Sequence, residues 1–183
     1  MPVRTQKGLS LLEMLISLAI VAIVVTAVSP SIQSILIKNK IVSEINELSA
    51  TIQFARSQAI DQQITTLVCP SNDFSACSGD WNDPKIVFVD SDNNGARGAD
   101  EELLASTGAI SASNVLTGPN NPLFFTASGE TLANTVLLLC HESKNAAYAR
   151  SLTIALQGRV KVSSDSDRNG VHEDAAGVAL NCP

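Results

Sequence analysis

The sequence predicts an α+β fold in which one long N-terminal helix packs on an antiparallel β-sheet domain. Residues 9–28 are predominantly apolar and carry no charge apart from Glu13, and residues 31–62 repeat apolar side chains every three or four positions, which is helical spacing. The remainder, residues 63–183, alternates short β-branched runs with segments rich in Asn, Asp, Ser and Gly, a pattern typical of strands joined by turns.

The apolar stretch is long enough to cross a membrane. About 20 residues in a helix span roughly 30 Å, the thickness of the hydrocarbon core. Arg4 and Lys7 precede the stretch, which favours a cytoplasmic N-terminus and places the rest of the chain on the other side. A cleaved secretory signal peptide is the alternative, with small residues at 27–29. However, Pro30 would follow that cut, and Glu13 interrupts the apolar run.

We expect the helix to continue to residue 62, with Pro30 as a position at which it can bend. Its second half is amphipathic and should lie on a sheet. The apolar positions on this face are Ile32, Ile35, Leu36, Val42, Ile45, Leu48, Ile52, Ala55 and Ala59. Strands are expected within residues 64–69, 85–90, 122–129, 134–141 and 151–164. The last of these segments is typical of a hairpin that turns at Gln157 and Gly158.

Composition limits the classes of function. The net charge is −6, which does not suit a general nucleic-acid binder, because such proteins gain affinity by neutralising phosphates. The sequence has no G-x-S-x-G motif and no spacing typical of a catalytic triad. We therefore expect a protein that is not an enzyme and requires no cofactor.

Four cysteines predict two disulfides. Cys69, Cys77, Cys140 and Cys182 lie in a domain expected outside the cytoplasm, where disulfides persist. Zinc binding is the alternative, but there is no C-x-x-C pair and the chain has only two histidines. Of the possible pairings we favour Cys69 with Cys77, which closes a short loop, and Cys140 with Cys182, which ties down the C-terminus.

One loop has the spacing of a calcium-binding EF-hand loop. Asp90, Asp92, Asn94 and Glu101 supply oxygen atoms at positions 1, 3, 5 and 12, and Gly95 takes the turn at position 6. The structural alternative is that Asp, Asn and Gly only build β-turns here. Calcium binding at this loop is therefore a hypothesis.

A second copy of the motif begins at Asp165 and ends at Gly170. Its twelfth position is Ala176, so it lacks the late acid that closes an EF-hand loop. The first loop is the better calcium candidate of the two.

Glu13 needs a partner, because an ionised acid near the centre of a membrane helix costs about 2.5–3.5 kcal/mol. The segment KGLSLLE, residues 7–13, resembles the processing site of type IV prepilins and type II secretion pseudopilins. The resemblance implies that Gly8 ends a leader of residues 1–8 and that prepilin peptidase cuts after it. Leu9 would then be N-methylated as the new N-terminus, although Phe or Met is commoner at this position.

The same resemblance implies that Glu13, the fifth mature residue, is a docking charge. Its carboxylate would pair with the terminal amine of a neighbouring subunit and set the axial register during assembly. Pro30 falls where many pilins carry a helix-bending proline. Residues 9–30 would form the transmembrane and filament-core helix, residues 31–62 its amphipathic continuation, and residues 63–183 a periplasmic domain.

The region after the helix is similar to a narrower group. The CPS tripeptide at residues 69–71, Trp81 and the stretch FVDSDNNG at residues 88–95 resemble the GspH/FimT family of H-type minor pseudopilins and minor pilins. The CPS tripeptide favours the FimU-like members. The resemblance implies a subunit that is incorporated at or near the tip of a type IV pilus or a type II secretion pseudopilus and helps to prime assembly.

Partners and location follow from that resemblance. The implied partners are prepilin peptidase, other minor and major pilins or pseudopilins, and the inner-membrane assembly platform. The implied location is the bacterial inner membrane, as a single-pass protein with a cytoplasmic N-terminus and a periplasmic C-terminal domain, and then the pilus or pseudopilus.

A DNA-binding minor pilin that acts in DNA uptake is the alternative function. The GRVK element, residues 158–161, resembles a basic element with which some related minor pilins bind DNA, so Arg159 and Lys161 would contact phosphate. The structural alternative is two solvent-facing basic residues on an ordinary hairpin. Asp165 and Asp167 follow closely and would repel phosphate.

Overall fold

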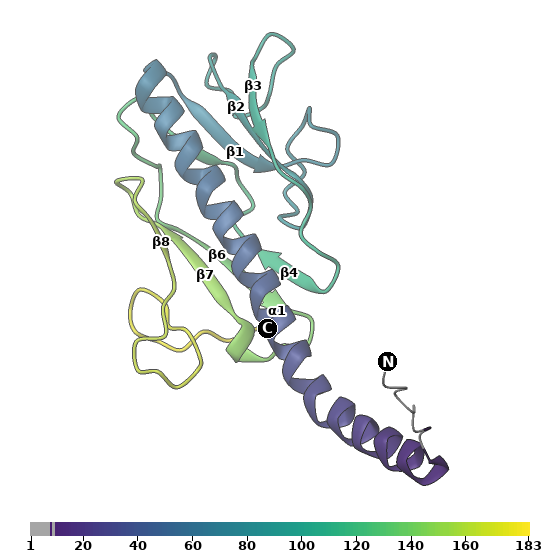
Figure 1. Ribbon diagram of the computed structural model, residues 1–183. Helices are drawn as coiled ribbons and strands as arrows, with labels where there is room; N and C mark the ends of the chain where they lie inside the picture. The colour runs from purple at the N-terminus through teal and green to yellow at the C-terminus, as the bar shows by residue number, and fades with distance from the viewer. Residues whose placement is uncertain (1–7, 9) are drawn as a thin grey trace, which may run out of the picture. The chain divides into compact units, whose positions relative to one another are not determined.

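The computed structural model describes Gly8 and residues 10–183, without the side chains of residues 27–30 (Figure 1). The chain divides into two compact units, Met1–Lys38 and Asn39–Pro183.

Helix α1, Leu11–Gln62, belongs to both units. Its first half, residues 11–38, lies in the first unit, and its second half, residues 39–62, lies in the second. The helix continues over Pro30 without interruption. It ends at Gln62, where the sequence predicted its end.

From Leu11 to Thr26 the first half of α1 is apolar on every side apart from Glu13, Ser17 and Thr26. By length and composition the helix can cross a membrane, with a mean hydropathy of 2.7 in its most apolar window. Every described side chain from Leu11 to Thr26 is exposed. Residues 11–26 therefore have no packing partner among the described residues of their unit.

The second half of α1 buries one face. The buried apolar side chains recur at helical spacing and are Ile41, Ile45, Leu48, Ile52, Ala55 and Ala59. The sequence placed Ile32, Ile35, Leu36 and Val42 on this face, but all four side chains are exposed, and Ile41 is fully buried instead of Val42. Val42 and Ile41 are neighbours on the helix, and only the position of the sheets decides which of the two points inward.

All strand pairs are antiparallel, as predicted. The strands form two four-stranded sheets, with the orders β3-β2-β1-β5 and β4-β6-β7-β8 (Figure 1). The strands are β1 Thr66–Pro70, β2 Lys85–Val89, β3 Leu103–Ser106, β4 Asn114–Thr117, β5 Leu123–Phe125, β6 Thr135–His141, β7 Arg150–Ile154 and β8 Val160–Val162. A short 3-10 helix, Ala146–Tyr148, lies between β6 and β7.

The division into two sheets was not predicted from the sequence. The chain leaves the first sheet for β4, returns to it for β5, and then completes the second sheet. Sheet membership depends on pairing between distant segments, such as β1 with β5, and no local pattern reports such pairing.

Each sheet has a buried cluster that contains a disulfide. In the first sheet Cys69 is buried with Leu67, Ile86 and Phe88, and it is bonded to Cys77. These residues fix β1 and β2 against each other and close the loop that follows β1.

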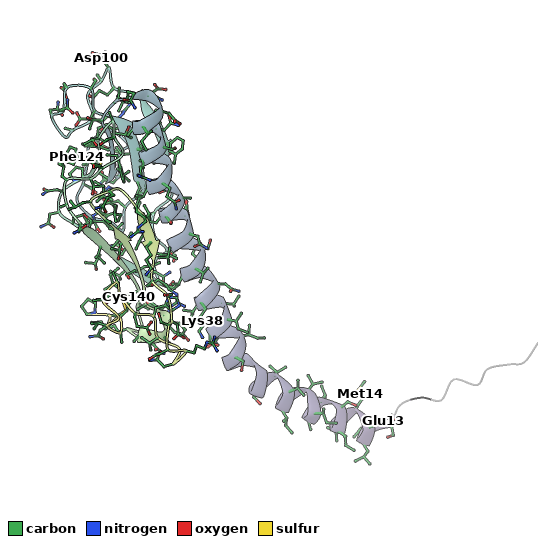
Figure 2. The ribbon with its side chains drawn as sticks, turned by 90° about the vertical axis from the view of Figure 1, so that its left-hand side faces the viewer. Glu13, Met14, Lys38, Asp100, Phe124 and Cys140 are labelled. Atoms are coloured by element: carbon green, nitrogen blue, oxygen red, sulfur yellow. A yellow bond between two sulfur atoms is a disulfide. The ribbon has the colours of Figure 1, made fainter. Side chains whose placement is uncertain are left out.

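In the second cluster Cys140 is buried with Ala149 and Leu180, and it is bonded to Cys182 (Figure 2). The two bonds are the pairings favoured from the sequence. By loop-closure entropy each bond stabilises the fold by roughly 2–4 kcal/mol.

Candidate functional sites

The start of α1 presents a capped helix end with an exposed acid. The Ser10 hydroxyl accepts a hydrogen bond from the Glu13 backbone N–H at 3.2 Å, which satisfies one of the free donors of the first turn. The Glu13 carboxylate lies in that turn, where the helix dipole favours a negative charge. Figure 2 shows Glu13 at this end of the helix. Gly8 is exposed, whereas Leu9, the predicted methylation site, lies outside the described residues.

The Glu13 carboxylate makes no hydrogen bond or ion pair with any residue that the structure describes. The side chains around it, among them Leu12 and Met14, are exposed and apolar. An isolated charge in such a surface needs an external partner when the surface is covered by lipid or by other helices.

In the first Asp–Asn–Gly loop, Asp90 organises the turn. Asp90 is fully buried, and its two carboxylate oxygens accept hydrogen bonds from the backbone N–H groups of Asn94 and Gly95, both at 3.1 Å. Burial raises the pKa of Asp90, although these hydrogen bonds act against the shift. Gly95 has a φ of 78°, in the left-handed region that favours glycine.

Glu101 closes the same loop. Its Oε1 accepts the Ser91 backbone N–H at 2.7 Å and its Oε2 accepts the Gly98 backbone N–H at 2.8 Å. Hydrogen bonding by Gly98 lowers the pKa of Glu101. The carboxylates of Asp90, Asp92 and Glu101 lie within 4.8 Å of one another, so the structure brings together the three predicted acids, and turn hydrogen bonds occupy both oxygens of Asp90 and of Glu101.

The second loop repeats this turn, but its closing glutamate lies at a different position in the loop. Asp165 accepts hydrogen bonds from the backbone N–H groups of Asn169 and Gly170, as Asp90 does from its own loop. The closing acid is Glu173, whose Oε2 accepts the Ser166 backbone N–H at 2.7 Å. Sequence reasoning missed Glu173 because it looked only at the twelfth position, whereas this acid comes at the ninth.

The basic hairpin presents Arg159 and Lys161 as exposed side chains. The glycine of the GRVK element has a packing role: Gly158 is buried, has a φ of 70°, and leaves no room for a Cβ atom beside the Gly129 carbonyl. Arg56 of α1 explains this close approach, because its guanidinium donates to the Gly129 and Gln157 carbonyls at 2.9 and 3.0 Å. No local sequence pattern indicates this contact.

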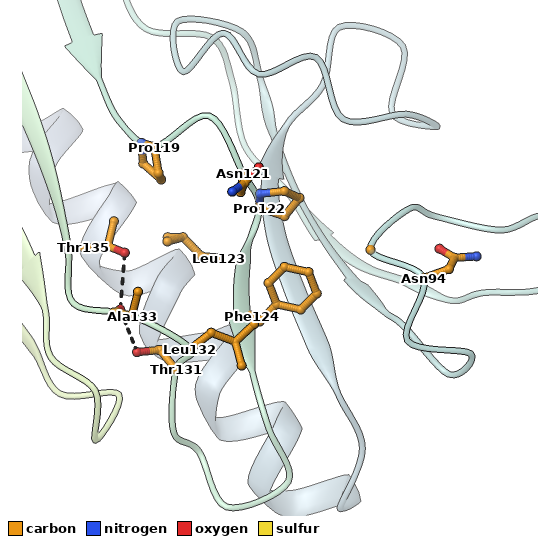
Figure 3. Close-up of a pocket in the computed structure, with 11 residues that line it drawn as sticks. Asn94, Pro119, Asn121, Pro122, Leu123, Phe124, Thr131, Leu132, Ala133 and Thr135 are labelled. Carbon is orange, nitrogen blue, oxygen red and sulfur yellow. Dashed lines mark hydrogen bonds between the residues drawn. The ribbon is translucent and has the colours of Figure 1, made fainter.

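A cleft of about 390 Å³ lies beside β5. Figure 3 shows Phe124, Leu123 and Leu132 among the residues that line it. Its described lining contains no titratable side chain, so acid–base chemistry has no group to use there.

The family model for the type II transport protein GspH matches residues 44–158, more than half of the chain. The chain belongs to the GspH family. A second model, the prokaryotic N-terminal methylation motif, matches residues 3–29. The methylation match spans Gly8, Leu9 and Glu13, on which the sequence resemblance depends.

Solved structures agree with this family in fold. The type IV minor pilin FimU of Pseudomonas aeruginosa superimposes with a TM-score of 0.58 at 23% identity, covering 70% of this chain and 92% of FimU. The minor pseudopilin EpsH of the Vibrio cholerae type II secretion system gives a TM-score of 0.51 at 10% identity, covering 68% and 96%. No curated protein sequence matches the chain significantly.

Family membership establishes a class of function. GspH-family proteins are non-enzymatic structural subunits of type IV pili or type II secretion pseudopili. The methylation motif implies association with prepilin peptidase, and the family implies association with other pilins or pseudopilins. The apolar first half of α1 is consistent with anchoring in the inner membrane.

Proposed function

We propose that this GspH-family chain is a minor subunit that primes assembly at or near the tip of a type IV pilus or a type II secretion pseudopilus. The observation that carries this proposal is the exposed, mostly apolar stretch of α1 from Leu11 to Thr26, in whose first turn Glu13 makes no ion pair with any described residue. Such a surface requires lipid before assembly and neighbouring helices afterwards. The assembly platform and the other subunits are the partners of this step.

Processing would precede assembly. Prepilin peptidase cuts between Gly8 and Leu9, and Leu9 becomes the methylated N-terminus. Arg4 and Lys7 hold the leader on the cytoplasmic side. The second unit then faces the periplasm, an oxidising compartment that suits its two disulfides.

Assembly would use Glu13 as the docking charge. As the subunit leaves the membrane, the carboxylate pairs with the terminal amine of a neighbour, which offsets the cost of burying either charge alone. The pairing is satisfied at one axial position only, so it sets the register of the new subunit. Pro30 lies in the same half of α1, where a bend would adjust helix packing.

The test is a strain deleted for the gene and complemented with the wild type, Glu13→Ala or Glu142→Ala. Surface pili with twitching, and export of secreted hydrolases, are scored in parallel. We expect the deletion to abolish one of these outputs, and we expect Glu13→Ala to be cleaved yet absent from fibres. Glu142 is an exposed acid of the second unit and is the matched control, which should restore function.

The outcomes separate the claims. Loss of pili with normal export assigns the subunit to a type IV pilus, and the opposite result assigns it to a type II secretion machine. A deletion that leaves both outputs intact would refute the proposed function. Normal incorporation of Glu13→Ala would refute the docking role alone.

DNA uptake remains the alternative function. The exposure of Arg159 and Lys161 favours it, whereas the acidic loop that begins at Asp165 opposes it. Binding of duplex DNA that weakens with salt, and weakens further when both basic residues are replaced, would be required. Salt-independent binding, or none, would remove this alternative.

Calcium at the first Asp–Asn–Gly loop also remains a proposal, with Asp90, Asp92, Asn94 and Glu101 as its ligands. Fibre assembly as described here does not depend on it. A melting temperature that is the same in calcium and in chelator would count against calcium at either loop of this chain.

A further inference from the structure

The C-terminal Asp–Asn–Gly loop, residues 165–173, gathers three carboxylates. Ligand oxygens of Asp165, Asp167 and Glu173 lie within 4.8 Å of one another. Like charges this close repel unless a cation lies between them or one of them is protonated. Proximity of acids alone does not make a metal site; a carboxylate oxygen that lacks a hydrogen-bond donor is stronger evidence.

Glu173 supplies the deciding observation. Its side chain is 8% exposed, and its Oε2 accepts the Ser166 N–H. Its Oε1 is buried and has no hydrogen-bond donor among the residues that the structure describes. A buried carboxylate oxygen without a partner is costly, and a cation bound at Glu173 would remove that cost.

The first loop does not share this feature. Glu101 uses Oε1 for the Ser91 N–H and Oε2 for the Gly98 N–H. The two loops therefore have the same turn but differ at the closing acid. Both carboxylate oxygens of Glu101 accept backbone hydrogen bonds, whereas Oε1 of Glu173 accepts none from the described residues. The difference favours the loop that lacks the EF-hand spacing.

We propose that residues 165–173 bind one calcium ion through Asp165, Asp167, Asn169 and Glu173. All four donors are oxygen atoms and three carry charge, which suits a hard divalent cation. Calcium accepts irregular shells of 6–8 oxygens, completed by backbone carbonyls and water, whereas magnesium demands a near-ideal octahedron. A short, irregular loop with four side-chain oxygens therefore fits calcium better.

The site lies where an ion would order the C-terminal segment. The Glu173 N–H donates to the Ser164 carbonyl at 3.0 Å, and the Leu180 N–H donates to the His172 carbonyl at 2.8 Å. Beyond Glu173 the described chain forms only isolated bridges before the disulfide of Cys182. Calcium would thus add a second anchor to a segment that has no regular strand.

The test is a calorimetric titration of the full chain in detergent micelles with calcium chloride, after removal of divalent ions by chelation. We expect a site at residues 165–173 with a dissociation constant of roughly 10⁻⁴–10⁻³ M or tighter, as in extracellular calcium modules. Glu173→Gln keeps the acceptor for Ser166 but removes the charge, and it should weaken binding about tenfold or more. Glu142→Gln, at an exposed acid outside both Asp–Asn–Gly loops, is the matched control and should leave the affinity of this site unchanged.

Asp167→Asn provides a second variant, because Asp167 is exposed and its replacement should not disturb folding. It should weaken binding as Glu173→Gln does, while the circular dichroism spectrum stays that of the wild type. Absence of calcium binding by the wild-type protein at about 10 mM, ten times the weakest expected constant, would overturn the proposal. So would calcium binding that Glu173→Gln leaves unchanged.

Discussion

The two halves of α1 are equally helical but differ in where their apolar side chains find partners. In the first half every described side chain from Leu11 to Thr26 is exposed. In the second half one row of apolar side chains, from Ile41 to Ala59, is buried within the second unit. A helix that is apolar all round belongs in a membrane or among other helices, whereas an amphipathic one belongs on a core. Residues 11–26 have no such core among the described residues of their unit, so we infer that lipid or the helices of other subunits cover them.

Two glutamates show the same contrast. Glu44, in the second half, is 6% exposed and accepts hydrogen bonds from the Asn114 side chain and the Ser111 backbone, with Lys40 at 3.3 Å. Burial acts to raise the pKa of Glu44, but these contacts outweigh it and the pKa is lowered. Glu13 has no such set among the described residues. One acid is satisfied on folding, and we propose that the other is satisfied on assembly.

A matched pair of isoleucine substitutions tests this contrast most strongly. Ile52 is fully buried and Ile20 is 57% exposed. Ile52→Ala should lower the free energy of unfolding by about 2–5 kcal/mol, because it removes buried methylene groups and leaves a cavity. Ile20→Ala should leave the free energy of unfolding unchanged. Urea unfolding of the full chain in micelles, followed by fluorescence of the buried Trp81, measures both.

Equal losses from the two substitutions would break the comparison, because the first half of α1 would then contribute to the core of the second unit. A loss from neither would mean that α1 is only loosely held on the sheets. The expected asymmetry supports independent roles for the two halves.

Local patterns predicted the helix well and the sheets only in part. Helical periodicity placed the end of α1 at Gln62, and alternation found most strands. Leu103–Ser106 and Asn114–Thr117 were missed because each is only four residues long; Asn114–Thr117 does alternate buried and exposed residues, but two repeats are too few to stand out in the sequence. The pairing of strands into two sheets depends on distant contacts that a local reading does not contain.

The candidate sites divide in the same way. Gly8, Glu13 and the acids of the first loop follow from fixed spacing along the chain, so the sequence was sufficient to identify them as candidates. Glu173 lies at the ninth position of its loop, so a search beyond the EF-hand spacing could identify it. Arg56 depends on where the chain passes in three dimensions, and no spacing rule could identify its contacts. The Ser10 cap is an intermediate case, because the pattern S-x-x-E at residues 10–13 is a known helix-start signal.

Arg56 offers a smaller test within the second half of α1. Arg56→Met keeps the aliphatic stem but removes the donors to the Gly129 and Gln157 carbonyls. We expect a loss of about 1.5–3 kcal/mol in the free energy of unfolding, the usual worth of hydrogen bonds to a charged group. Arg159→Met is the matched loss of an exposed arginine and should change stability by less than about 0.5 kcal/mol. Similar values for both variants would show that charge, not the bridge between two loops, matters here.

Replacement of Lys85 has the smallest expected effect on the free energy of unfolding, and it should stabilise the protein, whereas the substitutions of Ile52 and Arg56 destabilise it. Its side chain is 2% exposed, and its Nζ has no hydrogen-bond partner among the described residues. Burial lowers the pKa of Lys85 from 10.5 to about 8, against the attraction of nearby acids. Those acids are Glu44, Glu47, Asp83 and Asp80. Lys85→Met should therefore stabilise the protein at pH 7 by about 1 kcal/mol, since an apolar side chain of similar length avoids burying a charge.

The pH dependence distinguishes this explanation from better packing by methionine. Between about pH 8 and 10.5 the folded protein has released the Lys85 proton while the unfolded chain still holds it, so wild-type stability should rise with pH across this window. Lys85→Met lacks this contribution, and its advantage at pH 7 should shrink by pH 9.5. Lys161→Met, at an exposed position, should follow the wild type throughout. A Lys85→Met variant that is less stable than the wild type at pH 7 would show that attraction to Glu44 and Glu47 outweighs the cost of burial, and that charge pairing as well as apolar packing holds the second half of α1 on the first sheet.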